Sequence, residues 1–149
     1  MPKKILMVCL GNICRSPLAE GILKSKVGED VIVDSAGTAG YHVGHLPDER
    51  SIEVAKLNDV DITDQRARRV TLSDFDEYDH FYAMDEENYN NLIAMAKNDS
   101  QRSKVKMIMN ELYPNENIDV PDPYYGGDNG FKNVYKMLDL ATNKILEKL

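Results

Sequence analysis

Residues 9–16, with the sequence CLGNICRS, constrain the fold of this chain more than any other segment. They follow a short apolar and partly β-branched run at residues 4–9, which is too short for a typical helix and predicts a buried strand. Gly11 and Asn12 are residue types that accept a positive φ, so the chain can turn sharply after this strand. The segment therefore predicts a strand followed by a tight loop whose N–H groups point inward.

A helix is expected directly after this loop. Ser16 and Pro17 predict the N-cap and the first helical residue, and the apolar spacing that follows continues to about Val27. The N–H groups at a helix N-terminus, together with those of a tight loop, bind anions. The sequence thus predicts an anion site built from backbone groups alone.

Three side chains of the loop could make this anion site reactive. Cys9 is the candidate nucleophile, because a helix N-terminus and a nearby cation stabilise a thiolate. Arg15 offers a planar fork of donors that can bind two phosphoryl oxygens, and the Ser16 hydroxyl is placed to hydrogen-bond the thiolate. A chance Cys and Arg at a strand end is the simpler interpretation, but the flanking strand and helix patterns favour a phosphoryl-transfer loop.

Four segments of the chain resemble the low molecular weight protein tyrosine phosphatases. They are VCLGNICRSPLAE at residues 8–20, DSAGT at 34–38, Met84-Asp85, and DPYYG at 122–126. The resemblance implies an α/β fold, a four-stranded parallel sheet with helices on both faces and a phosphate-binding loop after the first strand. It also implies hydrolysis of phosphotyrosine through a phosphocysteine intermediate.

The same resemblance supplies a general acid and the walls of a substrate slot. An Asp-Pro pair by itself predicts only an exposed turn, but the match to the family's acid loop gives Asp122 the role of proton donor and, later, activator of water. Tyr124 and Tyr125 resemble one wall of a flat slot for the substrate ring, and Tyr41 resembles the opposite rim. The remaining substrate-binding positions are the loop residues Leu10, Gly11, Asn12, Ile13, Cys14 and Ser16.

Two supporting residues are also expected from the resemblance, and one departs from the family pattern. Asn12 resembles the residue that holds the loop in a left-handed conformation. The family usually supports it with a His, where this chain has Gln65, whose amide can still donate and accept hydrogen bonds. Asp85 resembles an Asp near the active-site loop and is expected to support it.

Composition narrows the class of protein further. The 149 residues suit one domain, residues 1–149, without repeats or a linker, and the net charge of −7 argues against general binding to nucleic acids or anionic membranes. Two cysteines within one loop fit reduced catalytic thiols better than a disulfide framework. The N-terminal apolar run is too short for a signal or membrane segment. We expect a cytoplasmic monomer without cofactor or metal, since His42, His45 and His80 form no ligand pattern.

Apolar strand-like runs alternate with helical patterns along the chain, which favours a parallel sheet. A long C-terminal helix over residues 130–149 has the clearest apolar spacing. The loops after the first and fourth strands are expected to meet at the carboxyl edge of the sheet. Further strands are predicted at residues 31–35, 80–84 and 105–109, and further helices at 48–58 and 86–96.

Three other functions are alternatives to tyrosine phosphatase activity. An arsenate reductase of this fold needs cysteines outside the loop, and this chain has none. A protein-arginine phosphatase has a Thr where this chain has Ile13, and the apolar Ile13 favours a flat aromatic substrate. A non-catalytic phosphate-binding module would lack Cys9 or Asp122.

We expect phosphotyrosine proteins or peptides as substrates and phosphate or vanadate as inhibitors. Cys14 is either a packing residue or a redox partner of Cys9.

Overall fold

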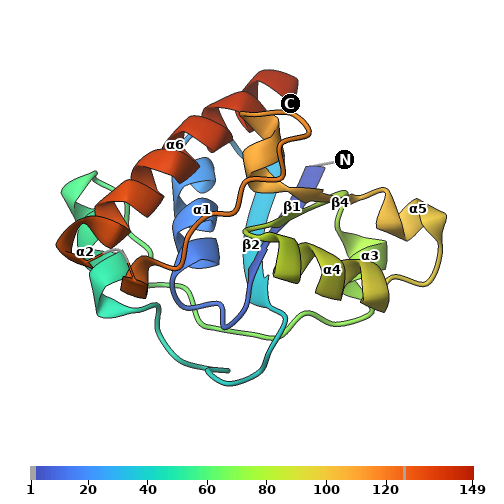
Figure 1. Cartoon of the computed structure of the whole chain (residues 1–149), viewed down its shortest axis with the longest axis horizontal. Coiled ribbons are helices and arrows are strands. Elements are labelled where there is room, and N and C mark those ends of the chain that lie inside the picture. The colour runs from blue at the N-terminus through green and yellow to red at the C-terminus, as the bar shows by residue number, and fades with distance from the viewer. Residues whose placement is uncertain (1–2, 126) are drawn as a thin grey trace.

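The computed structural model describes residues 3–125 and 127–149, and within them it contains one parallel four-stranded sheet. The strand order is β2-β1-β3-β4 (Figure 1). The chain leaves β1, forms β2 on one side of it, and then crosses to form β3 on the other side. Such a reversal opens a crevice at the carboxyl ends of the central strands, where α/β proteins bind ligands. The strands are β1 (Lys3–Cys9), β2 (Val31–Gly37), β3 (His80–Ala83) and β4 (Val105–Met107).

Helices cover both sides of this sheet, as the family resemblance implies (Figure 1). One side carries α1 (Arg15–Lys24), α2 (Glu49–Leu57) and α6 (Gly130–Lys148), and the other carries α3 (Asp74–Glu77), α4 (Glu86–Met95) and α5 (Asp99–Arg102). Single 3-10 turns follow at η1 (Ile108–Glu111), η2 (Pro123–Tyr125) and η3 (Gly127–Asn129). In the described part of the chain, none of the helices is both long and apolar enough to cross a membrane.

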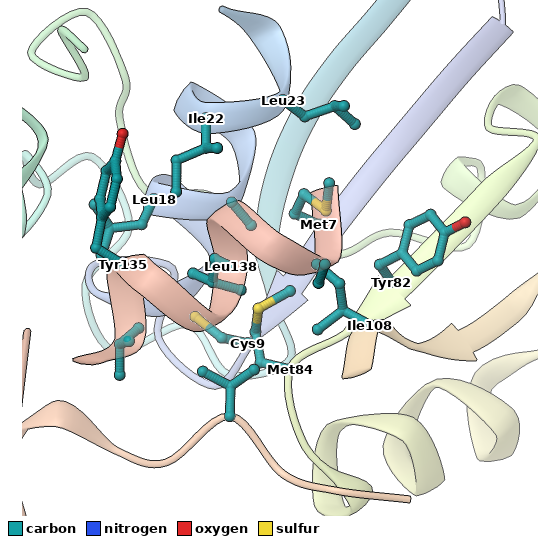
Figure 2. Packing of buried hydrophobic residues seen from close by; sticks show 14 of the residues in the cluster. Met7, Cys9, Leu18, Ile22, Leu23, Tyr82, Met84, Ile108, Tyr135 and Leu138 are labelled. Atoms are coloured by element: carbon teal, nitrogen blue, oxygen red, sulfur yellow. The ribbon is translucent and has the colours of Figure 1, made fainter. Parts of the chain in front are cut away.

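The central strand β1 supplies side chains to two separate cores. Ile5, Met7 and Cys9 belong to the core under α1 and α6, whereas Leu6 and Val8 belong to the core under α3 and α4. This division follows from the two-residue period of a strand. Figure 2 shows Met7 facing labelled side chains of α1 and α6. Each large apolar side chain contributes roughly 1.5–3 kcal/mol when fully buried, so the buried residues of β1 stabilise the sheet from both sides.

Helix α1 differs in its bounds from the sequence prediction. It begins at Arg15, with Cys14 as N-cap, instead of at Pro17 after a Ser16 cap. The Ser16 hydroxyl is unavailable for capping because it hydrogen-bonds inside the loop, to Cys9 Sγ at 3.0 Å. The helix also ends at Lys24, before Val27, since the Ser25 hydroxyl donates to the carbonyl oxygen of Ile22 (2.6 Å) and closes the last turn.

Candidate active site

The end of β2 fixes the backbone of the loop that follows β1. The carbonyl oxygens of Cys9 and Leu10 accept hydrogen bonds from the N–H groups of Thr38 (3.0 Å) and Ala39 (2.9 Å). A trans peptide points its N–H away from its C=O, so the N–H groups that follow these carbonyls point into the loop. Gly37 permits the close approach, because a Cβ there would lie 2.6 Å from the Leu10 carbonyl oxygen.

Gly11 and Asn12 do different things in the turn. Asn12 has φ 59°, the left-handed conformation expected for it. Gly11 is not among the residues with positive φ, which corrects its expected role. It is needed for space instead, since a Cβ would lie 2.9 Å from Cδ2 of His42.

A buried hydrogen-bond network holds the Asn12 side chain. Its Nδ2 donates to the hydroxyls of Ser16 and Ser35, each at 2.9 Å, and its Oδ1 accepts from the backbone N–H of Arg68 at 3.1 Å. The Ser35 hydroxyl in turn lies 2.7 Å from Oε1 of Glu20. These contacts tie the loop to α1, to β2 and to the segment before α3.

The chemistry of these groups fixes the direction of each hydrogen bond. An ionised carboxylate only accepts, so Ser35 donates to Glu20 and must accept from Asn12. Asn12 therefore uses both Nδ2 hydrogens, and Ser16 accepts one of them. The Ser16 hydroxyl proton is then free to point at Cys9 Sγ, 3.0 Å away. The network orients Ser16 to donate to a thiolate.

Gln65 is placed differently from the sequence prediction. Its Nε2 donates to the Pro17 carbonyl oxygen at 3.0 Å, and its Oε1 is buried without a hydrogen-bond partner in the described part of the chain. The support of Asn12 comes from the two serines and the Arg68 backbone, so Gln65 braces the start of α1 rather than Asn12 itself.

Arg15 is oriented by two partners behind the loop. Its Nη1 donates to Oδ2 of Asp85 at 2.8 Å and to the carbonyl oxygen of Val120 at 2.9 Å. Asp85 is itself fixed as the N-cap of α4, where it accepts from the N–H of Asn88. Both contacts use Nη1, so the Nε and Nη2 edge of the guanidinium has no hydrogen-bond partner among the described residues. That edge has the geometry suited to bidentate binding of an anion.

A cavity of about 180 Å³ joins the loop to two distant segments. Asp122 and Tyr124 come from the end of the connection between β4 and α6, and Tyr41 and His42 come from the segment after β2. Asp122 is exposed, and its Oδ1 accepts from the N–H of Tyr124 at 3.0 Å. The cavity is lined by Cys9, Leu10, Gly11, Ile13, Cys14, Arg15, Tyr41, His42, Asp122 and Tyr124.

The sequence-predicted site residues are thus mostly brought together. Asn12, Ser16 and Asp85 lie just behind the cavity wall, as the hydrogen bonds above show. Tyr41 is 76% exposed and stands at the rim. The side chain of Tyr125 falls outside the described residues.

His42 is a cavity residue that the sequence prediction missed. The sequence showed only that the three histidines form no metal-ligand pattern, yet His42 lines the cavity beside Gly11. Its position next to Tyr41, the predicted rim residue, is the signal that could have found it. His45 is not among the cavity residues, and its ring centroid lies 5.8 Å from that of His42. His80 is the first residue of β3, at the amino end of the strand, whereas the cavity lies at the carboxyl ends of the strands.

The two loop cysteines have different surroundings. Burial raises the pKa of Cys14 to about 12, against a smaller opposing effect of its hydrogen bond to Tyr124. Cys14 Sγ donates to the Tyr124 hydroxyl at 3.4 Å. Cys14 is therefore a protonated thiol at neutral pH, which leaves Cys9, at the carboxyl end of β1, as the candidate nucleophile.

The site is that of an α/β protein with a thiol, a guanidinium and a carboxylic acid around an anion-binding loop. Comparison with known proteins shows a similarity that covers nearly the whole chain. Residues 4–149 match the family described as "Low molecular weight phosphotyrosine protein phosphatase". The protein of that name from Schizosaccharomyces pombe is 40% identical, over 94% of this chain and 93% of its own length.

Solved structures agree with this match. A protein tyrosine phosphatase from Entamoeba histolytica has a TM-score of 0.90 at 38% identity, covering 98% of this chain and 96% of its own. A Drosophila arginine phosphatase has a TM-score of 0.89 at 32% identity, covering 97% and 96%. The chain belongs to the low molecular weight phosphotyrosine protein phosphatase family.

Proposed function

We propose that this protein hydrolyses phosphotyrosine in proteins or peptides, with Cys9 as nucleophile, Arg15 as phosphoryl ligand and Asp122 as general acid and base. One observation carries the proposal. Three chemically complementary side chains, two from the loop after β1 and one from a segment more than a hundred residues later, line one small cavity together with Tyr41 and Tyr124.

In the first step the Cys9 thiolate attacks phosphorus. A sulfur–phosphorus bond forms as the bond between phosphorus and the tyrosine oxygen breaks, and protonated Asp122 gives its proton to that oxygen. Arg15 and the loop N–H groups stabilise the charge on the other phosphoryl oxygens. The products are tyrosine and a phosphocysteine.

In the second step water replaces the thiolate. The Asp122 carboxylate takes a proton from water as the oxygen attacks phosphorus, and the sulfur–phosphorus bond breaks to release phosphate. The Ser16 hydroxyl, oriented toward Cys9 Sγ by Asn12, stabilises the departing thiolate. Cys9 and Asp122 return to their starting protonation states.

The cavity walls support an aromatic substrate. Tyr41, Tyr124 and the apolar side chain of Ile13 line it, and flat apolar walls suit a phenyl ring. Phosphoarginine is the competing substrate, because one related structure is an arginine phosphatase. Phosphate and vanadate should inhibit by occupying the loop in place of the substrate phosphoryl group. We further propose a monomer acting in the cytoplasm, a reducing compartment that suits a catalytic thiol.

Hydrolysis of three phosphopeptides tests this proposal. Peptides that carry phosphotyrosine, phosphoserine or phosphoarginine at one position are compared at equal concentration, with wild type and Cys9→Ser. We expect phosphotyrosine to be the preferred substrate and Cys9→Ser to be inactive on all three while still binding inorganic phosphate weakly. Preference for phosphoarginine would replace the substrate assignment, and an active Cys9→Ser would overturn the mechanism.

A further inference from the structure

The first turn of α2 contacts the phosphate-binding loop from outside. The N–H of Asp48 donates to the Ile13 carbonyl oxygen at 2.7 Å, and the Ser51 hydroxyl donates to the Cys14 carbonyl oxygen at 3.3 Å. Ser51 is fully buried. This turn is therefore fixed against one side of the cavity.

The same turn also contacts the acid-loop side of the cavity. Oδ2 of Asp48, the N-cap of α2, accepts from the Tyr124 hydroxyl at 2.6 Å. The Arg50 guanidinium carbon lies 4.5 Å from the ring centroid of Tyr124 and 4.7 Å from that of Phe131. The two rings meet edge to face, 5.9 Å apart. One cation thus contacts the ring of the cavity wall and the first turn of α6.

The contact of Asp48 and Arg50 with Tyr124 needs an ionised carboxylate, a cation and a neutral hydroxyl. Nε and Nη2 of Arg50 donate to the two Asp48 carboxylate oxygens, at 3.2 and 3.3 Å. Burial would raise the pKa of Asp48, but its hydrogen bonds with Arg50 and Tyr124 outweigh burial and lower it. Burial and the bond to Asp48 raise the pKa of Tyr124, so its hydroxyl stays a donor. At neutral pH all three groups hold the charge state that the contact needs.

We propose that Asp48 and Arg50 are positioning residues that fix the ring of Tyr124 as the aromatic wall of the cavity and so favour aryl over alkyl phosphates. Neither residue is among the described residues that line the cavity, so both act through Tyr124. The same turn binds the phosphate loop, and it therefore sets the spacing between that loop and Tyr124. The inference rests on the proposed function, whose substrate preference it explains.

Two kinetic constants of Arg50→Met, KM and the inhibition constant of phosphate, distinguish positioning of Tyr124 from a general effect on the fold. Methionine keeps an apolar stem near the rings but removes the cation and both side-chain hydrogen bonds to Asp48, while the backbone N–H of residue 50 still donates to Asp48 Oδ1. We expect KM for a phosphotyrosine peptide to rise about five- to tenfold, while the inhibition constant of inorganic phosphate stays unchanged, because phosphate needs only the loop. Arg50→Lys, which keeps a cation near the rings, should recover part of the loss.

Two further variants complete the test. Tyr124→Phe keeps the ring but removes its hydroxyl, and combined with Arg50→Met it should give less than the product of the single effects, because both act through Asp48. Arg102→Met is the matched control, since Arg102 is an exposed arginine on α5 paired with Asp99, and its KM should equal that of the wild type.

The outcomes that contradict the inference are distinct from failure of the proposed function. An unchanged KM in Arg50→Met, or a phosphate inhibition constant that rises by the same factor as KM, would overturn the positioning role. A wild-type protein that hydrolyses no aryl phosphate would overturn the proposed function, and the inference with it.

Discussion

At the scale of single residues, the direction of hydrogen bonds matters as much as their presence. The Glu20 carboxylate can only accept, and this orients Ser35, Asn12 and finally Ser16 toward Cys9. The residue types of this network are readable in the sequence, but their order is not, because Glu20 and Ser35 lie on different elements. The ring of His42 explains the need for Gly11 in the same way, through a contact between distant segments.

Asp122→Asn tests the acid at this scale. Asparagine keeps the hydrogen bond to the Tyr124 N–H but cannot transfer a proton, so kcat with phosphotyrosine should fall roughly 10²–10⁴-fold. Aryl phosphates whose leaving groups need no proton should lose much less, as a series of leaving groups measured on both proteins will show. An equal loss across the series would mean that another group is the acid.

At the scale of elements, patterns with a strong period predicted the structure well. The C-terminal helix predicted at residues 130–149 is found as α6, Gly130–Lys148, because its apolar positions recur along one face over the whole length. The helix predicted at residues 48–58 is found as α2, Glu49–Leu57. The four-residue helices α3 and α5 were not predicted, since one turn is too short to show a period.

Strand β3 carries a titratable group whose effect on stability can be measured. Burial lowers the pKa of His80, and Lys106 and Lys3 lower it further, against smaller effects of Asp79 and Glu111. The folded protein thus holds its proton less tightly than the unfolded chain. The stabilising contribution is present above the unfolded pKa of about 6.5 and is lost as pH falls through the lower folded value.

We therefore expect the urea midpoint of the wild type to fall between about pH 7.5 and pH 5.5, a window above the carboxyl range. His80→Gln removes the titrating ring and should show a smaller fall over the same window. Parallel curves for the two proteins would assign the pH dependence to other groups.

At the scale of the whole molecule, sequence reasoning predicted the parallel sheet, its covered faces and the edge at which the site forms. The parallel sheet and the edge follow from local patterns combined with general rules of topology, whereas helices on both faces were implied by the resemblance to a known family. The meeting of Asp122 with Cys9 required more, because only the resemblance to a known family distinguished Asp122 from an ordinary turn residue. The part played by α2 could not be predicted, since the sequence indicates only a helix over residues 48–58 and does not show that Asp48 and Arg50 contact Tyr124 and Phe131.

The central claim is that Cys9 forms a covalent bond to phosphorus during turnover. The most direct measurement mixes the protein with a ³²P-labelled aryl phosphate, stops the reaction within one turnover under conditions that preserve thiophosphate bonds, and locates the label by peptide mapping. The account predicts label on the peptide that contains Cys9, its disappearance as phosphate is released, and no label on Cys9→Ser. Steady turnover without labelled protein, or label on a residue other than Cys9, would contradict it.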